Sequence, residues 1–242
     1  MKSYSSQIKK QIEEMKAGAV ITPDLFSGAW SRNAITRTLS RLNKEGLISR
    51  IKKGVYTKTE ETRFGTLSAT TIEILANEIE SDDNKCFGGL FLYNNLGLTT
   101  QVPNVIEVLN NKSSYLQDLK STKVRYVKTR PRIEKATKPY IILLEVIKNL
   151  SNIPDSDIDH IFNWIKSKAE KLNQQELKKL YNISLDYPPR VRAILGCLLS
   201  SKQNELSDKI WKTLNVNSTY KVGAMGNYLN DPKKWRLKIE AA

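Results

Sequence analysis

Cationic and hydrogen-bonding side chains are concentrated between residues 31 and 53. At 100° per residue, the segment 32–44 places Ile35, Leu39 and Leu42 on one helical stripe and polar or basic residues on the opposite one, with no carboxylate before Glu45. Arginine and lysine reach guanine acceptors or phosphate, and asparagine pairs with adenine. The pattern therefore predicts a DNA-recognition helix. Its candidate contact residues are Ser31, Asn33, Thr36, Arg37, Ser40, Arg41 and Lys44.

A basic hairpin is expected directly after this helix. In the stretch "LISRIKKGVYTK", Leu47, Ile48, Ile51 and Val55 supply apolar residues, and Gly54 permits a tight turn. Arg50, Lys52 and Lys53 place positive charge at and beside the turn. A basic hairpin in this position is typical of a wing that contacts the phosphate backbone next to the groove read by the helix.

The elements that must hold this helix are also readable. Residues 4–16 predict a first helix, and "TPDLFS" predicts a short second one with Thr22 as cap and Pro23 in its first position. Ser31 is the expected N-cap of the third helix, and Gly46 its C′ residue. Residues 1–58 are therefore predicted to form a winged helix-turn-helix domain. The alternative is the same fold used only for protein contact, with its lysines serving solubility.

The charge of the whole chain favours an anionic partner. The formal net charge is +14 over 242 residues, with a pI of about 9.6, which suits nucleic acid, an anionic membrane surface or an acidic protein. Residues 1–58 carry about twelve Lys or Arg against about four Asp or Glu. The densest apolar run, "YIILLEVI", is too short to span a bilayer, and no signal peptide is expected. We therefore expect a cytoplasmic, nucleoid-associated protein without a membrane partner.

The remaining chain predicts a larger, second domain. The polar stretch 57–66 is the expected linker, and residues 66–242 form the second domain, mixed α/β to about residue 139 and helical beyond it. In the mixed part, "TLSATTIEILANEI" and "GGLFLYNNLGL" predict helices, whereas "NVIEVLNN" and "KVRYVKTR" predict strands. The fold class expected for the chain is α+β, mainly helical, with a small sheet.

No catalytic constellation is apparent. His160 lacks partners for a nucleophilic triad and is expected on a helix surface, and Cys86 and Cys197 are too few for a zinc site and too far apart for a disulfide framework. Gly88-Gly89 lacks the spacing of a phosphate-binding loop. We expect no enzyme activity, no metal and no cofactor. The tail "YKVGAMGNYLNDPKKWRLKIE" allows RNA stacking, but such aromatics more often close a core.

Several stretches resemble one protein family. "GAVITPDLFS", "ITRTLSRLNKEGLISRIKKGVYTKT", "GLTTQVPN", "YPPRVRAILGCLL" and "YKVGAMGNYLNDPKKWRLK" are similar, in this order, to AbiEi-like antitoxins of type IV toxin–antitoxin systems. The winged-helix part alone is unspecific. "GLTTQVPN" and "YPPRVRA" are the more specific stretches, and the resemblance extends across nearly the whole chain.

The resemblance implies an autorepressing antitoxin that acts in abortive phage infection. Its N-terminal winged helix would bind inverted repeats in the operator of its own operon, on double-stranded DNA, through the outward residues named above. Its C-terminal domain would counter a nucleotidyltransferase-like toxin, with or without a direct complex. The resemblance names no toxin-neutralising residues; Gln101, Arg190 and Arg192 lie in the family-like stretches, where structural roles are at least equally expected. The alternative function is a protein- or RNA-binding module that neutralises a toxin or protects its substrate without promoter binding.

Overall fold

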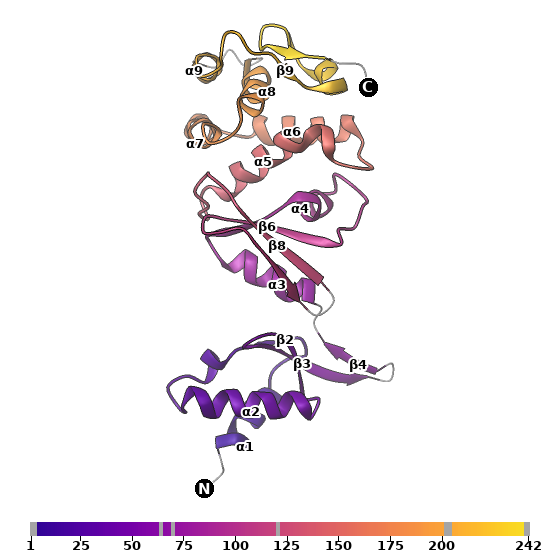
Figure 1. Cartoon of the computed structure of the whole chain (residues 1–242), viewed down its shortest axis with the longest axis vertical. Helices are drawn as coiled ribbons and strands as arrows, with labels where there is room; N and C mark the ends of the chain where they lie inside the picture. Colours follow the sequence, from indigo (N-terminus) through magenta and orange to yellow (C-terminus); the bar gives the residue numbers. More distant parts are fainter. Residues whose placement is uncertain (1–3, 63–64, 69–70, 120–121, 201–204, 240–242) are drawn as a thin grey trace. The chain divides into compact units, whose positions relative to one another are not determined.

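The computed structural model describes residues 4–62, 65–68, 71–119, 122–200 and 205–239 of the chain. The chain divides into two compact units. The N-terminal unit comprises Met1–Ser81 and Asp118–Lys123, and the C-terminal unit comprises Asp82–Gln117 and Val124–Ala242. The described residues form helices together with small separate sheets, and α5 to α9 follow one another without a strand between them, so the α+β class expected from the sequence is confirmed (Figure 1).

The N-terminal unit combines short helices with a sheet of order β1-β3-β2, in which β4 pairs with β3. Its elements are α1 (Tyr4–Glu13), β1 (Val20–Ile21), the 3₁₀ helix η1 (Pro23–Phe26), α2 (Arg32–Lys44), β2 (Ile48–Lys52), β3 (Val55–Thr62), β4 (Gly65–Ser68) and α3 (Thr71–Ser81). Ile35, Leu39 and Leu42 of α2 are buried at 1% exposure or less, in one cluster with Ile8 and Ile12 of α1. The predicted apolar stripe is therefore confirmed. Thr38, not expected inside, is also buried.

The stretch expected as a polar linker is a strand. β3 continues without interruption to Thr62, and Thr59 to Thr62 pair antiparallel with Ser68 to Gly65 of β4. The linker prediction is thus wrong within the described residues. Thr57, Thr59 and Thr62 favour extended backbone although they are polar, because β-branched side chains suit a pleated surface. The compact N-terminal unit extends beyond the expected domain of residues 1–58, and α3 begins only at Thr71.

The C-terminal unit contains a mixed part followed by helices. Its elements are β5 (Lys85–Gly88), α4 (Gly89–Asn95), β6 (Val105–Asn110), α5 (Lys138–Asn149), the 3₁₀ helix η2 (Leu150–Asn152), α6 (Ile158–Glu170), α7 (Gln174–Ser184), α8 (Pro189–Ser200), α9 (Glu205–Trp211), β9 (Tyr220–Lys221), the 3₁₀ helix η3 (Gly223–Tyr228) and β10 (Leu237–Lys238). Strands β7 (Tyr115–Leu119) and β8 (Thr122–Lys128) complete a sheet of order β5-β6-β8-β7.

Most expected elements of this unit are confirmed. The helix over "GGLFLYNNLGL", the strands β6 and β8, and the helices beyond Pro139 all occur. The short strands β5 and β7 escaped sequence reasoning, because a few residues do not establish a period of two. The tail forms the parallel pair β9–β10, and Trp235 is buried at 2% exposure with its ring edge on Trp211. The largest aromatic residue of the tail therefore closes a core. Of the two roles considered for the tail, RNA stacking and core closure, this is the more common one.

The half-buried Glu107 and the buried Tyr93 and Tyr187 are under the electrostatic influence of Glu145 of α5. Glu145 is 2% exposed and forms an ion pair with Lys148, with 3.0 Å between Oε2 and Nζ. Burial, followed by the charge of the neighbouring Glu145, raises the pKa of the Glu107 carboxyl and of the Tyr93 and Tyr187 hydroxyls. Glu107 is thus destabilised as an anion by its surroundings.

Replacing Glu107 should stabilise the protein at neutral pH. The folded protein holds the Glu107 proton more tightly than the unfolded chain does, so the free energy of unfolding falls as pH rises through the raised pKa. We expect Glu107→Gln to raise the melting temperature at neutral pH and to leave it unchanged below the ordinary carboxyl pKa. Thermal melts across this pH range measure the effect. Glu80→Gln, at an exposed position, is the control and should show no such gain; a melting temperature lowered by Glu107→Gln at neutral pH would contradict the argument.

Candidate nucleic-acid interface

The start of α2 is set by a side-chain cap. The Ser31 hydroxyl accepts a hydrogen bond from the Ala34 backbone N–H at 3.4 Å, as the N-cap prediction required. The preceding short helix is the 3₁₀ helix η1, with Pro23 in its first turn. Thr22 occupies the N-cap position, as expected, although its side chain makes no capping hydrogen bond.

The end of α2 is set by a left-handed glycine. Gly46 has φ +81°, and its N–H donates to the Asn43 carbonyl at 3.3 Å while the Leu47 N–H donates to the Leu42 carbonyl at 3.1 Å. These two bonds form a Schellman motif. Leu47 also packs against the core beside Leu42. With both ends closed and the apolar stripe buried, α2 cannot turn about its axis without exposing its core face.

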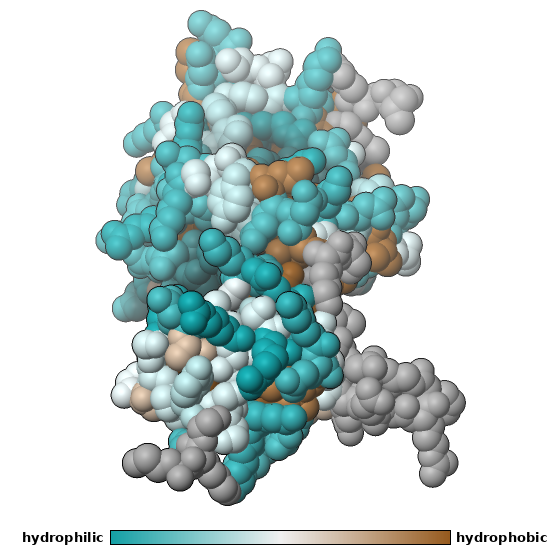
Figure 2. Space-filling model, turned by 60° about the horizontal axis from the view of Figure 1, so that its bottom comes forward, coloured by the Kyte–Doolittle hydropathy of each residue, from teal (hydrophilic) through white to brown (hydrophobic). Residues whose placement is uncertain are grey.

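The opposite face of α2 is open to solvent. Asn33, Arg37, Ser40 and Lys44 are exposed, and within the described part of the chain none of these four side chains has a hydrogen-bond or ion-pair partner. The drawn face of the molecule is mostly hydrophilic, with hydrophobic residues in scattered patches rather than one broad area (Figure 2). The four side chains are therefore free to donate to an acceptor-rich ligand such as DNA.

Two further predicted contacts on α2 are exposed but already engaged. The Thr36 hydroxyl donates to the Arg32 carbonyl at 2.8 Å, within its own helix. Arg41 forms an ion pair with Glu45, with 3.4 Å between Nε and Oε1, and also donates to the Ser5 hydroxyl. A ligand must displace or share these bonds, so Thr36 and Arg41 are weaker candidates than Arg37.

The hairpin after α2 is tied to the helix and presents Lys53 at its tip. Lys52 pairs with Val55, which leaves Lys53 and Gly54 as the turn, and Gly54 has φ +77°. An irregularity in register between Arg50 and Lys52 puts both Ile48 and Ile51 on the buried side, three residues apart, and leaves Arg50 exposed. The Arg50 backbone N–H donates to the Asn43 side chain of α2 at 2.8 Å.

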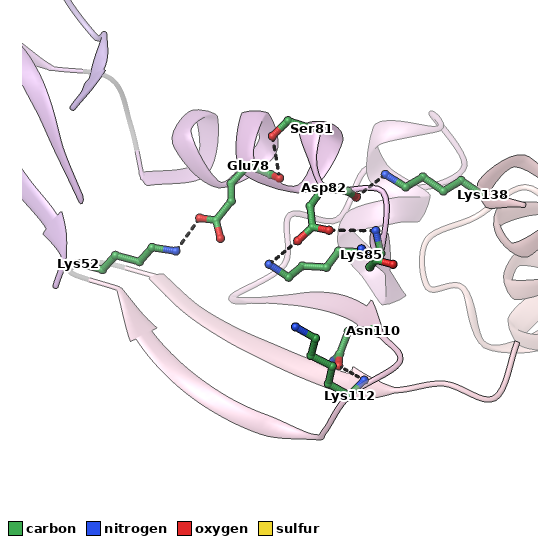
Figure 3. Close-up of polar contacts among 9 residues, drawn as sticks. Lys52, Glu78, Ser81, Asp82, Lys85, Asn110, Lys112 and Lys138 are labelled. Carbon is green, nitrogen blue, oxygen red and sulfur yellow. Dashed lines mark hydrogen bonds and ion pairs between the residues drawn. The ribbon is translucent and has the colours of Figure 1, made fainter. Parts of the chain in front are cut away.

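Lys52 differs from its neighbour Lys53. Its ammonium lies 2.5 Å from a carboxylate oxygen of Glu78 on α3, and its side chain is only 21% exposed (Figure 3). Lys53 is exposed and, among the described residues, unpaired. The structure therefore gives Lys52 a role within the N-terminal unit and leaves Lys53, with the exposed Arg50, on the accessible side of the hairpin. No sequence signal distinguished the two lysines, since Glu78 lies 26 residues away.

Sequence reasoning missed two other basic residues of this unit. Arg32 is exposed at the start of α2, paired with Asp24 at 3.3 Å. Lys58 donates to the carbonyls of Glu13 and Met15, beyond the last turn of α1. A cation there satisfies unpaired carbonyls and opposes the negative end of the helix dipole, so Lys58 holds α1 rather than facing a ligand.

The polar residues of the two specific family-like stretches act inside the C-terminal unit. Gln101 donates to Asp155 at 2.8 Å. Arg190 donates to the Lys148 and Lys221 carbonyls, and Arg192 donates to the carbonyls of Leu185, Tyr187 and Thr213. These side chains join separate segments of the unit, so the expected structural roles are observed.

The thiols and the histidine offer little to a nucleophilic site. Cys86 and Cys197 are both buried and unpaired, and burial is the main cause that raises the pKa of each thiol to about 12. Each thus stays protonated at neutral pH. His160 is exposed on α6. Within the described residues, no three His, Cys, Asp or Glu side chains are grouped to hold a metal ion, and no helix is long and apolar enough to cross a bilayer.

Comparison with known proteins places the chain in a family. The model of DUF6088, a family of unknown function, matches residues 7–180, which include α2, the hairpin and both four-stranded sheets. The chain belongs to this family. No curated protein matches the chain.

A solved structure shares the fold. The crystal structure of the RV2827C protein from Mycobacterium tuberculosis is similar to the chain with a TM-score of 0.53 and 12% sequence identity, over 98% of this chain and 91% of that one. At this identity, the likeness shows a common fold and nothing of function. Because the likeness covers almost all of both chains, it extends over both compact units.

The two hairpin lysines should respond differently to loss of charge. Lys52→Met keeps the aliphatic stem but leaves Glu78 without this cation, so we expect it to lower the free energy of unfolding by about 0.5–1 kcal/mol at low salt. Lys53→Met should change it by less than about 0.5 kcal/mol. Denaturant unfolding at low and high salt measures the free energy of unfolding of both variants. Because salt screens the ion pair, the difference between the two variants should be smaller at high salt. Equal losses for the two variants would contradict the distinction.

Proposed function

We propose that the protein is a sequence-specific DNA-binding antitoxin that represses its own operon. In this proposal α1, η1 and α2 form a helix-turn-helix, α2 is the recognition helix, and the β2–β3 hairpin is the wing. The observation that carries it is the free, exposed row of Asn33, Arg37, Ser40 and Lys44 opposite the buried stripe of α2. A solvated helix face ordinarily mixes both charge signs, whereas α2 from Arg32 to Lys44 contains no carboxylate and Glu45 follows as its C-cap.

Each exposed group has a physical role in the proposed complex. Arg37, near the middle of α2, presents a planar guanidinium suited to the two acceptors of guanine, and Asn33 presents an amide suited to adenine. Lys44 and Lys53 present point charges suited to phosphate, which position the protein without reading sequence. The start of α2 is closed by the Ser31 side chain and its end by backbone bonds, so these groups are held in place before DNA arrives.

The antitoxin part of the proposal rests on the resemblance to AbiEi-like antitoxins together with the division into two units. The N-terminal unit carries the basic helix and hairpin, and the C-terminal unit would counter a nucleotidyltransferase-like toxin. Both would act in the cytoplasm: the N-terminal unit at the operator, and the C-terminal unit against the activity of the toxin. The alternative is a protein- or RNA-binding module that neutralises the toxin, or protects its substrate, without promoter binding.

Separate variants test base reading and phosphate contact. With the DNA upstream of its own coding sequence as probe, Arg37→Ala should cost about 1–3 kcal/mol of binding free energy and reduce the preference over scrambled DNA. Lys53→Ala should weaken binding to both DNAs alike and lower the salt slope by about 1. Mobility-shift titrations at two salt concentrations measure both effects.

A matched control is Lys178→Ala, which removes one positive charge from an exposed position on α7. It should leave DNA binding unchanged. The assignment of α2 as recognition helix fails if Arg37→Ala and Lys178→Ala behave alike. Co-expression with the proposed nucleotidyltransferase-like toxin tests the functions of the two units separately. The Arg37→Ala variant should lose repression of the operon but still rescue growth. Loss of both repression and rescue would contradict the division of roles.

A further inference from the structure

A basic groove lies in the C-terminal unit and includes none of the residues assigned to DNA. It has a volume of about 730 Å³ and is lined by Asn111, Lys128, Thr129, Arg130, Arg132 and Asp186. Lys128 and Arg130 are exposed and, within the described residues, have no side-chain partner. Arg132 is paired with Glu134 at 2.6 Å but is 85% exposed. The lining therefore carries a net positive charge. Two of its cations, Lys128 and Arg130, form no ion pair within the described residues.

The segment that carries these cations is held rigidly by one asparagine. The Asn111 side chain donates to the Thr129 and Pro131 carbonyls and accepts from the Ile133 N–H at 2.8 Å. Pro131 and Ile133 are buried, whereas Arg130 and Arg132 point to solvent. Asn111 thus fixes a stretch of backbone that presents alternate residues to an anionic ligand. Such preorganisation lowers the entropy lost on binding.

The adjacent asparagine fixes the turn before β7. The Asn110 side chain accepts from the Lys112 and Ser113 N–H groups at 2.8 and 3.0 Å and donates to the Ser113 and Val127 carbonyls (Figure 3 shows the bond to Lys112). Two neighbouring asparagines therefore use their amides to order the loop and the segment next to it. Neither amide is left free to bind a ligand, so their role is to position the cations.

An exposed aromatic ring is carried by β7, the strand paired with β8, which ends at the groove residue Lys128. Tyr115 follows Ser114, whose hydroxyl accepts from the Lys128 N–H at 2.9 Å. One face of the Tyr115 ring is stacked on the buried Tyr126, with 4.3 Å between centroids and 13° between planes, yet Tyr115 stays 49% exposed. A ring supported on one side and open on the other is a platform for an unstacked base.

We propose that the C-terminal unit binds single-stranded RNA in this groove, with Lys128, Arg130 and Arg132 on the phosphates and a base on Tyr115. A duplex keeps its bases stacked and offers nothing to the Tyr115 ring, which favours a single strand. Asp186 opposes phosphate but accepts a hydrogen bond from a ribose 2′-hydroxyl, a group that DNA lacks. The inference adds a ligand to the proposed antitoxin and does not depend on DNA binding by α2.

The test measures fluorescence anisotropy of a labelled oligouridine of about ten nucleotides with the full-length protein. Arg130→Ala should weaken binding about fivefold or more, and binding should fall as salt rises. Tyr115→Leu, which keeps apolar bulk but removes the π-face, should also weaken it about fivefold or more. Arg130→Lys should retain most of the affinity, and Lys178→Ala all of it. Circular dichroism melts confirm that each variant is folded.

The competing outcomes are distinct. Equal affinity for the deoxyuridine oligomer would overturn the assignment to RNA, and full competition by duplex DNA would overturn the assignment to a single strand. Unchanged binding by both Arg130→Ala and Tyr115→Leu would remove the groove as the site. Arg37→Ala should bind the oligouridine normally, and Arg130→Ala should bind promoter DNA normally, so failure of this inference and failure of the proposed repressor role give different results.

Discussion

Burial of the apolar stripe of α2 is the constraint on which the interface depends. Ile35, Leu39 and Leu42 supply much of a small core that also needs Ile8 and Ile12 of α1. A core of this size has no replacement for them, so turning the helix would expose apolar area that nothing else covers. The cap at Ser31 and the Schellman motif at Gly46 close the ends of the same helix. Packing of one face thereby determines what the other face presents to solvent.

The basic residues of the protein fall into two physical classes. In the first class, the side chain binds a carboxylate or backbone carbonyls within its own unit, as in Lys52, Lys58, Arg190 and Arg192. Arg37, Lys44, Lys53 and Arg130 are exposed and uncommitted among the described residues. The net charge of +14 thus overstates the charge available to a ligand. Long-range attraction follows net charge, but specific contacts require donors that folding has not already used.

The two proposed ligand surfaces use different chemistry. On α2, free donors extend from a rigid helix, the shape that enters the major groove of a duplex. In the C-terminal unit, cations lie on a segment held by asparagine side chains, and the neighbouring strand β7 carries an open aromatic ring. The first geometry suits an intact duplex and the second an unpaired strand. Together they suit an antitoxin that represses its operon and engages a nucleic acid relevant to its toxin.

Much of the fold was determined by local sequence. Amphipathic periodicity located α2 and the helices beyond Pro139, and residue chemistry located the cap at Ser31 and the turns at Gly46 and Gly54, because these features depend on residues a few positions apart. The extended β3, the short strands β5 and β7, and the pairing of Lys52 with Glu78 were decided by tertiary structure. So was the basic groove, whose lining joins Asn111, Arg130 and Asp186. Such features arise between segments that are distant in the sequence. Local sequence patterns do not predict which of these side chains the folded chain brings together.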